Sequence, residues 1–192
     1  MMQKSVLSGI SQDSFVLVLI DEAQYARSLE DLIRSVEKTH THICYICMSK
    51  PYTDVMEDLS AMGTETDKFF FIDGLSSHYK IPQPVQNCIF ITSPSDLEQI
   101  RLAIIEAVEK HDCSTIIFDT ITTMLIYQQT SSIVHFTNML VSEKKQENAK
   151  KLFIVLKEGA SGIHGAGDLE KDLELFADRK IDMTRNIKGR EK

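Results

Sequence analysis

Short apolar runs, separated by longer stretches of mixed polarity, constrain the fold of this chain more than any other feature. The run Phe15–Ile20 is apolar at every position, which is typical of a strand covered on both faces of a sheet. Alternation of such strands with helices predicts an α/β fold with a mainly parallel central sheet. The other predicted strands are Ile43–Met48, Phe69–Ile72, Cys88–Ile91, Thr115–Phe118, Leu152–Leu156 and Lys180–Met183.

The stretches between these strands have the apolar spacing of helices. Leu29, Leu32, Ile33 and Val36 recur at helical intervals within a helix predicted over about 24–39. Helices on both faces of the sheet would give a three-layer sandwich, and no linker divides the chain, so we expect one domain over residues 1–192. Further helices are predicted from Pro51 to about Gly63, from Ser93 onward, from about Ser131 to Asn148 and near Leu169–Phe176.

The helix after Cys88–Ile91 has the clearest start signal in the chain. Ser93 can cap it, Pro94 fits its first position, and Asp96 completes a spacing like that of a capping box. Inward-facing residues are expected in this helix and in the helix over about 131–148. They are Leu97, Ile100, Ile104 and Val108 in the first, and Val134, Met139, Leu140 and Val141 in the second.

Composition restricts the partners and the compartment of the protein. The 192 residues carry a formal net charge of −7, so a nucleic-acid backbone would be repelled on average. No apolar run approaches the length of a membrane span, and Met1–Ser14 has no signal-peptide core. We therefore expect a cytoplasmic protein with no nucleic-acid partner and no membrane insertion.

The four cysteines do not form a recognisable framework. Cys44 and Cys47 make a CxxC motif, but they lie within a predicted strand, where an odd separation places side chains on opposite faces. This spacing argues against a metal site or a redox pair. Cys88 and Cys113 lie in or beside other apolar runs and are expected to be core thiols.

The order of these segments resembles the RecA-like core of the KaiC family, which includes archaeal KaiC-like proteins and the archaellum ATPase subunit. The resemblance implies a RecA-like P-loop NTPase core and places Phe15–Ile20 where the strand before the phosphate loop would be. It also places Asp119 at the position of the Walker B aspartate. The segments that carry the resemblance are Pro51–Leu59, Lys68–Ser76, Ser114–Thr122 and Leu175–Met183.

The residues after the first predicted strand depart from a phosphate loop. Such a loop needs glycines, so that backbone N–H groups can surround the phosphates, and a lysine to neutralise their charge. Here Asp21 and Glu22 follow the strand, no glycine occurs between Gly9 and Gly63, and no Gly-Lys-Ser/Thr motif exists. Because the two carboxylates would repel a triphosphate, the sequence predicts a degenerate Walker A position.

The catalytic position implied by the resemblance is also changed. The family's catalytic glutamates would follow the second strand, where this chain has Ser49 and Lys50, and neither is a carboxylate base. Asp119 alone would hold magnesium chiefly through water and the phosphates of a nucleotide. We expect Asp119 to be structural, with a metal or nucleotide site as the alternative, and we expect no cofactor.

Two other parts of the sequence suggest a site. Asp21, Glu22 and Asp119, with Lys157 after a later strand, could form a receiver-like phosphoacceptor site, although a receiver places its acceptor much earlier in the chain. The loop Gly159–Gly167 lacks the spacing of a nucleotide loop and holds no lysine or arginine, so a flexible connection or a protein contact is favoured.

His40 and His42 flank the start of a predicted strand, which makes a two-histidine metal site conceivable. No carboxylate or thiol obviously completes such a site. The favoured interpretation is two solvated loop histidines.

The leading hypothesis is a non-catalytic member of the KaiC/RecA-like superfamily that acts in regulation or signalling through protein–protein contacts. The loss of the ATP-binding motifs carries this hypothesis, whereas the protein partner, or self-association, follows only from analogy with the fold. The alternatives are a divergent nucleotide- or metal-binding regulatory protein that uses Asp119, and the receiver-like phosphoacceptor.

Overall fold

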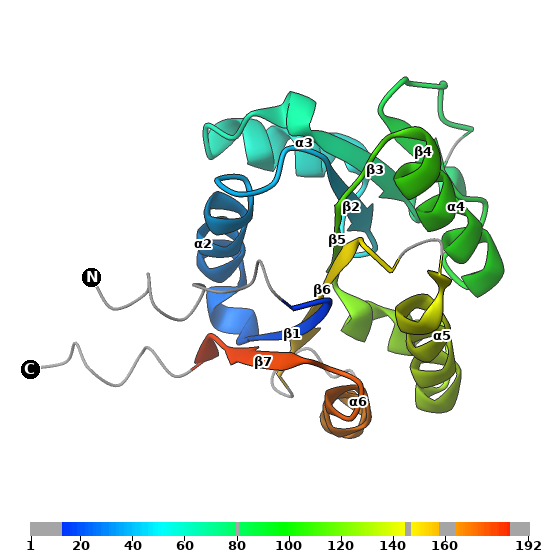
Figure 1. The fold of residues 1–192 in the computed structure, drawn as a ribbon. Coiled ribbons are helices and arrows are strands. Elements are labelled where there is room, and N and C mark those ends of the chain that lie inside the picture. Colours follow the sequence, from blue (N-terminus) through cyan, green and yellow to red (C-terminus); the bar gives the residue numbers. More distant parts are fainter. Residues whose placement is uncertain (1–12, 80, 145–146, 158–163, 185–192) are drawn as a thin grey trace, which may run out of the picture.

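The computed structural model describes residues 13–79, 81–144, 147–157 and 164–184, and a seven-stranded sheet lies at its centre (Figure 1). The strand order is β4-β3-β2-β5-β6-β1-β7, and every neighbouring pair is parallel. The predicted mainly parallel sheet is confirmed. Its strands are β1 (Phe15–Ile20), β2 (Ile43–Cys47), β3 (Phe69–Asp73), β4 (Cys88–Phe90), β5 (Thr115–Asp119), β6 (Lys150–Leu156) and β7 (Arg179–Asp182).

Helices cover both faces of this sheet, which confirms the predicted three-layer sandwich (Figure 1). One face carries α2 (Tyr25–Val36) and α3 (Tyr52–Ala61). The other face carries α4 (Leu97–Lys110), α5 (Thr130–Ser142) and α6 (Ala166–Glu174). Within the described ranges, none of the helices combines the length and the apolar composition of a bilayer span.

The strands are apolar at nearly every position because both of their faces are buried. In β2, Cys44 and Ile46 pack toward α4 and α5, whereas Tyr45 and Cys47 pack toward α2 and α3. The prediction that the two cysteines of the CxxC motif lie on opposite faces is therefore confirmed. Cys88 and Cys113 are buried as well, as predicted for core thiols.

The start of α4 differs from the prediction. The N-cap is Asp96, whose Oδ1 accepts a hydrogen bond of 2.9 Å from the Gln99 amide, whereas the Ser93 hydroxyl pairs with Ser95. The side chain of Gln99 in turn accepts hydrogen bonds from Thr92, including one of 2.6 Å from its amide. The assignment of Ser93 as the cap is therefore wrong, and the helix begins at Leu97, three residues later than predicted.

The cap assignment gives a direct test on stability. Asp96→Ala is expected to lower the free energy of unfolding by about 1 kcal/mol, because it leaves a helix-terminal amide without its acceptor. Ser93→Ala is the matched control, with an expected change within about 0.5 kcal/mol. Urea denaturation followed by circular dichroism measures both. Equal losses in the two variants would contradict the cap assignment.

The end of α5 and the start of α6 also differ from the prediction. The helix predicted over about 131–148 ends at Ser142, where Glu143 turns to an extended conformation and pairs with Arg101 of α4 at 2.9 Å. Met139, expected to face inward, is 37% exposed, whereas Leu140 is buried as predicted. The loop Gly159–Gly167 lies mostly outside the described residues; α6 begins at Ala166, directly after Gly165 at a φ of 88°.

The parallel arrangement brings the carboxyl ends of all strands to one edge of the sheet, where ligand sites of such folds form. Asp21 follows β1, Lys157 follows β6, and Asp119 is the last residue of β5. Ser49 and Lys50 lie in the loop between β2 and α3. This edge therefore holds the residues predicted for a nucleotide or phosphoacceptor site, whereas His40 and His42 precede β2 at the opposite edge.

Candidate functional site

The candidate site is built around Asp119 at the carboxyl end of β5. This residue is only 2% exposed, and it lies in register with Cys47 at the end of β2. On its other side β6 separates β5 from β1, so the segment after β1 must reach across one strand to meet it. The peptide bond between Asp119 and Thr120 is cis.

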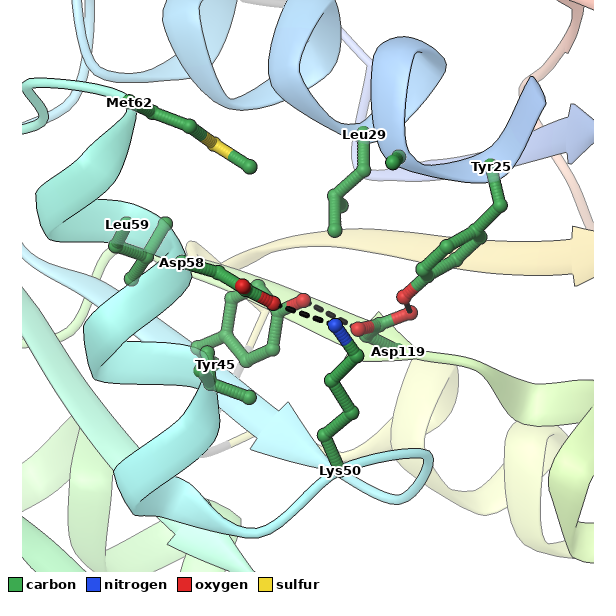
Figure 2. Close-up of a pocket in the computed structure, with 10 residues that line it drawn as sticks. Tyr25, Leu29, Tyr45, Lys50, Asp58, Leu59, Met62 and Asp119 are labelled. Carbon is green, nitrogen blue, oxygen red and sulfur yellow. Dashed lines mark hydrogen bonds and ion pairs between the residues drawn. The ribbon is translucent and has the colours of Figure 1, made fainter.

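Three hydroxyl groups converge on the carboxylate of Asp119. Tyr25, the first residue of α2, donates to Oδ1, and Tyr45 in the middle of β2 donates to Oδ2 (Figure 2). The hydroxyl of Ser49 lies 3.4 Å from Oδ2 and 3.4 Å from the backbone oxygen of Asp119. The carboxylate is thus held by donors from three separate segments of the chain.

The electrostatics of this cluster follow from its burial. Burial raises the pKa of Asp119 above its ordinary value, while the hydrogen bonds from Tyr25, Tyr45 and Ser49 oppose this shift. Burial, together with the nearby charge of Asp119, also raises the pKa of both tyrosines well above the usual range. The phenols therefore remain protonated and act as hydrogen-bond donors to the carboxylate.

The structure brings some of the predicted site residues together and leaves others apart. Ser49 belongs to the Asp119 cluster, and Lys50 lines the adjoining cavity, where its Nζ contacts Asp58 at 2.6 Å. Asp21 instead caps the short turn Glu22–Gln24, accepting a hydrogen bond of 3.2 Å from the Ala23 amide. Glu22 is exposed. Among the interactions of the described residues, neither Asp21 nor Glu22 takes part in the cluster around Asp119.

Sequence reasoning missed the two tyrosines. Tyr45 is 1% exposed and carries the one side-chain hydroxyl in the run Ile43–Met48, and a buried phenol needs a hydrogen-bond partner. That requirement was a usable signal for a polar acceptor nearby. Tyr25 gave a weaker signal, because it lies beside charged residues in what looks like an exposed helix start.

A cavity of about 100 Å³ adjoins the cluster, between α2 and α3 (Figure 2). Asp119, Tyr25 and Tyr45 form its polar end, and Lys50 and Asp58 are the charged pair on its wall. The remaining lining is apolar and consists of Ala26, Leu29, Val55, Leu59 and Met62. The cavity is therefore a small apolar chamber with a single polar end.

A second buried carboxylate at this edge of the sheet has a structural role. Asp73 at the end of β3 accepts four hydrogen bonds, from the amides of Tyr52, Leu75 and Ser76 and from the Ser76 hydroxyl. Across the described ranges, no group of three or more His, Cys, Asp or Glu residues is placed to hold a metal ion. Lys157, the lysine of the receiver-like interpretation, is exposed.

The two histidines that flank β2 differ in their environments. His42 is exposed, but His40 is only 9% exposed, so the interpretation of both as solvated loop residues is wrong for His40. Burial lowers the pKa of His40, and the nearby Lys150 lowers it further. His40 is therefore a largely buried, neutral side chain at the amino end of the sheet.

Comparison with known proteins supports the fold. No protein-family model matches the sequence. No curated protein matches it either. The structure resembles the crystal structure of a KaiC-like protein from the hyperthermophilic archaeon Pyrococcus horikoshii OT3, with a TM-score of 0.56 and 12% sequence identity over 81% of this chain and 69% of that chain. A sequence identity this low supports a conclusion about the fold alone. The chain thus has a KaiC-like, RecA-like α/β fold.

Proposed function

We propose that this chain is a non-catalytic KaiC/RecA-like domain, a pseudo-ATPase of the cytoplasm that acts in regulation or signalling through protein–protein contacts. One observation carries the proposal. Both carboxylate oxygens of Asp119, the counterpart of a Walker B aspartate, accept hydrogen bonds from tyrosine hydroxyls. One of these tyrosines, Tyr25, comes from the segment where a phosphate loop would otherwise lie.

This arrangement opposes magnesium binding. Magnesium requires oxygen ligands in near-ideal octahedral geometry and keeps several of its waters. At Asp119 the ion would have only a cavity of about 100 Å³ for itself and its waters, beside a carboxylate whose two oxygens already accept hydrogen bonds from phenols. Asp119 therefore serves as an anchor between α2, β2 and β5 and not as a ligand for a metal–nucleotide complex.

The surroundings supply no substitute for the missing phosphate-binding groups. The turn after β1 contains Asp21 and Glu22 and no glycine. A phosphate placed there would therefore meet negatively charged carboxylates and not free backbone N–H groups. Lys50, the cation beside the cavity, is paired with Asp58. Ser49 holds the carboxylate of Asp119 and cannot act as a carboxylate base.

Support for a protein partner comes from the connection between β3 and β4. Tyr79 and Ile81 on this connection are 82% and 91% exposed, and large apolar side chains exposed together often mark protein contacts. The stretch from Gly74 to Ser95 contains no aspartate or glutamate, although the chain has 28 in all. An acidic protein surface would therefore meet little repulsion at this part of the molecule.

The proposal predicts that the wild-type chain neither binds nor hydrolyses ATP. Isothermal titration with Mg–ATP at micromolar to millimolar concentrations should give no binding heat, and a phosphate-release assay should give no turnover. The physical reason is that the phosphates lack amide and lysine donors and that both oxygens of the Asp119 carboxylate already accept hydrogen bonds from phenols.

A matched pair of variants makes this test decisive. Tyr25→Ala opens the space beside Asp119 but adds no phosphate-binding group, so its titration should stay silent as well. Micromolar Mg–ATP binding by the wild type that disappears in Asp119→Asn would overturn the proposal. That outcome would favour the alternative of a divergent nucleotide-binding regulatory protein.

A further inference from the structure

The hydroxyl protons of the Asp119 cluster are all used within the cluster, so only acceptor lone pairs remain for a ligand. The hydroxyls of Tyr25 and Tyr45 donate to the carboxylate of Asp119, and the Ser49 hydroxyl lies 3.4 Å from both Oδ2 and the backbone oxygen of the same residue. A phenol or hydroxyl oxygen that donates its one proton can still accept, and each carboxylate oxygen has two lone pairs. The polar end of the cavity therefore offers a ligand acceptors only, and a group placed there has to be a donor.

The charge of the cluster points the same way. The hydrogen-bond partners of the buried Asp119 carboxylate are neutral hydroxyls, whereas Lys50 on the cavity wall donates to Asp58 at 2.6 Å and lowers the pKa of Asp119 less than those hydroxyls do. A carboxylate removed from water without a direct cationic partner costs free energy, and a cation placed beside it recovers part of that cost. A positively charged donor is therefore preferred over a neutral one at this end.

The cavity limits the size and polarity of the rest of such a ligand. Beyond the polar end the chamber is walled by Leu29, Val55, Leu59 and Met62 (Figure 2). Its volume is about 100 Å³. Because a dry cavity of about 150 Å³ accommodates benzene, this chamber has room for about four non-hydrogen atoms. A charged head with a short hydrocarbon body fits these dimensions.

We propose that the chamber between α2 and α3 binds a small aliphatic primary amine, with its ammonium group on Asp119 and the phenol oxygens and its hydrocarbon body against Leu29, Leu59 and Met62. This inference rests on the proposed function, because it assigns the Asp119 end to an organic cation where an active relative would hold a metal–nucleotide complex. Occupation of the chamber would tie α2 and α3 together across the ends of β2 and β5. An amine of this class is then the effector of a regulatory domain.

Three probes of matched size test the proposal: propylamine, 1-propanol and propionate. Protein-observed NMR of the Leu and Met methyl groups is suited to the dissociation constants on the order of millimolar that a ligand of about four non-hydrogen atoms allows. Propylamine should shift the methyl signals of Leu29, Leu59 and Met62 and saturate. The alcohol should bind at least tenfold more weakly, and propionate should cause no saturable shift.

Two variants and one control variant locate the site. Asp119→Asn keeps the shape and removes the charge, so propylamine should lose at least tenfold in affinity while 1-propanol is little changed. Ala26→Leu places a larger side chain on an exposed helix position that lines the chamber, and it should weaken every probe; Ala61→Leu, exposed on α3 and absent from the lining, should weaken none. Amine affinity should also fall with decreasing pH as Asp119 becomes protonated.

Failure of this inference is distinguishable from failure of the proposed function. Equal binding of propylamine and 1-propanol, or unchanged propylamine binding in Asp119→Asn, overturns the amine site. The absence of saturable methyl shifts at propylamine concentrations of about 100 mM also overturns it, because a site with a millimolar dissociation constant would be nearly saturated at that concentration. None of these outcomes alters the Mg–ATP titration, which by itself decides whether the domain is a pseudo-ATPase.

Discussion

Phe153→Ala is expected to lower the free energy of unfolding by about 3–5 kcal/mol, the largest single loss among the variants considered. Phe153 is fully buried in β6, which lies between β5 and β1 near the middle of the sheet. Its ring lies 5.1 Å from that of Phe15 and 5.2 Å from that of Phe118, so it joins the side chains of three neighbouring strands. Truncation would remove these contacts and leave a cavity beneath the helices.

Urea denaturation followed by circular dichroism measures this loss. Tyr79→Ala is the control, because it deletes an aromatic ring that is 82% exposed, and the expected change is within about 0.5 kcal/mol. A loss below about 1 kcal/mol for Phe153→Ala would show that this part of the core repacks far more readily than a close-packed interior should.

Tyr45→Phe is expected to lower the free energy of unfolding by about 1.5–3 kcal/mol at neutral pH, because it deletes a hydrogen bond to a buried charged group. The ring keeps its size, and Tyr45 is only 1% exposed, so the substitution removes the hydroxyl without changing the packing of the ring. The effect isolates the hydrogen bond to Asp119 from the packing of the ring.

The loss in Tyr45→Phe should depend on pH in a defined direction. The Tyr45 hydroxyl lowers the pKa of Asp119 and thereby opposes the effect of burial, so its removal raises that pKa further. The hydroxyl consequently stabilises the fold when Asp119 is ionised, and its contribution is lost as the pH falls through the pKa of Asp119. The stability difference between the variant and the wild type should therefore shrink toward acid pH.

Tyr52→Phe is the matched control for this experiment. The Tyr52 hydroxyl donates to a neutral acceptor, Oδ1 of Asn87, at 3.0 Å and is only partly buried. A loss of about 0.5–1.5 kcal/mol is expected, without a comparable pH dependence. A deficit for Tyr45→Phe that stays constant across the acid range would contradict the assigned role of its hydroxyl.

The strands were predictable because burial on both faces makes them apolar at successive positions. This local pattern located β1, β2 and β6 within one or two residues. The start of α4 was misplaced because Ser93 and Asp96 both have capping side chains, and the choice depends on the pairing of Thr92 with Gln99. Such a choice is made by packing, and sequence spacing alone does not record it.

The candidate site was only half predictable for a related reason. Asp119 was predictable because it ends an apolar run that resembles the Walker B strand of the KaiC family, and both features lie within one short segment. Its two phenol partners lie 94 and 74 residues away in the sequence, and only the strand order brings them to it. In the sequence, Asp21 and Glu22 are the conspicuous residues after the first strand, whereas Tyr25, which follows them, makes the hydrogen bond to Asp119.

The opposite orientation of Cys44 and Cys47 makes the sheet a partition between two sets of thiols. Cys44 and Cys113 lie beneath the layer of α4, α5 and α6, whereas Cys47 and Cys88 lie beneath α2 and α3. Cys44 and Cys47 are both 0% exposed in the middle of the sheet, so an alkylating reagent reaches either of them only when the overlying helices move away. Timed alkylation with peptide mass spectrometry would therefore report separately on how often each helical layer opens.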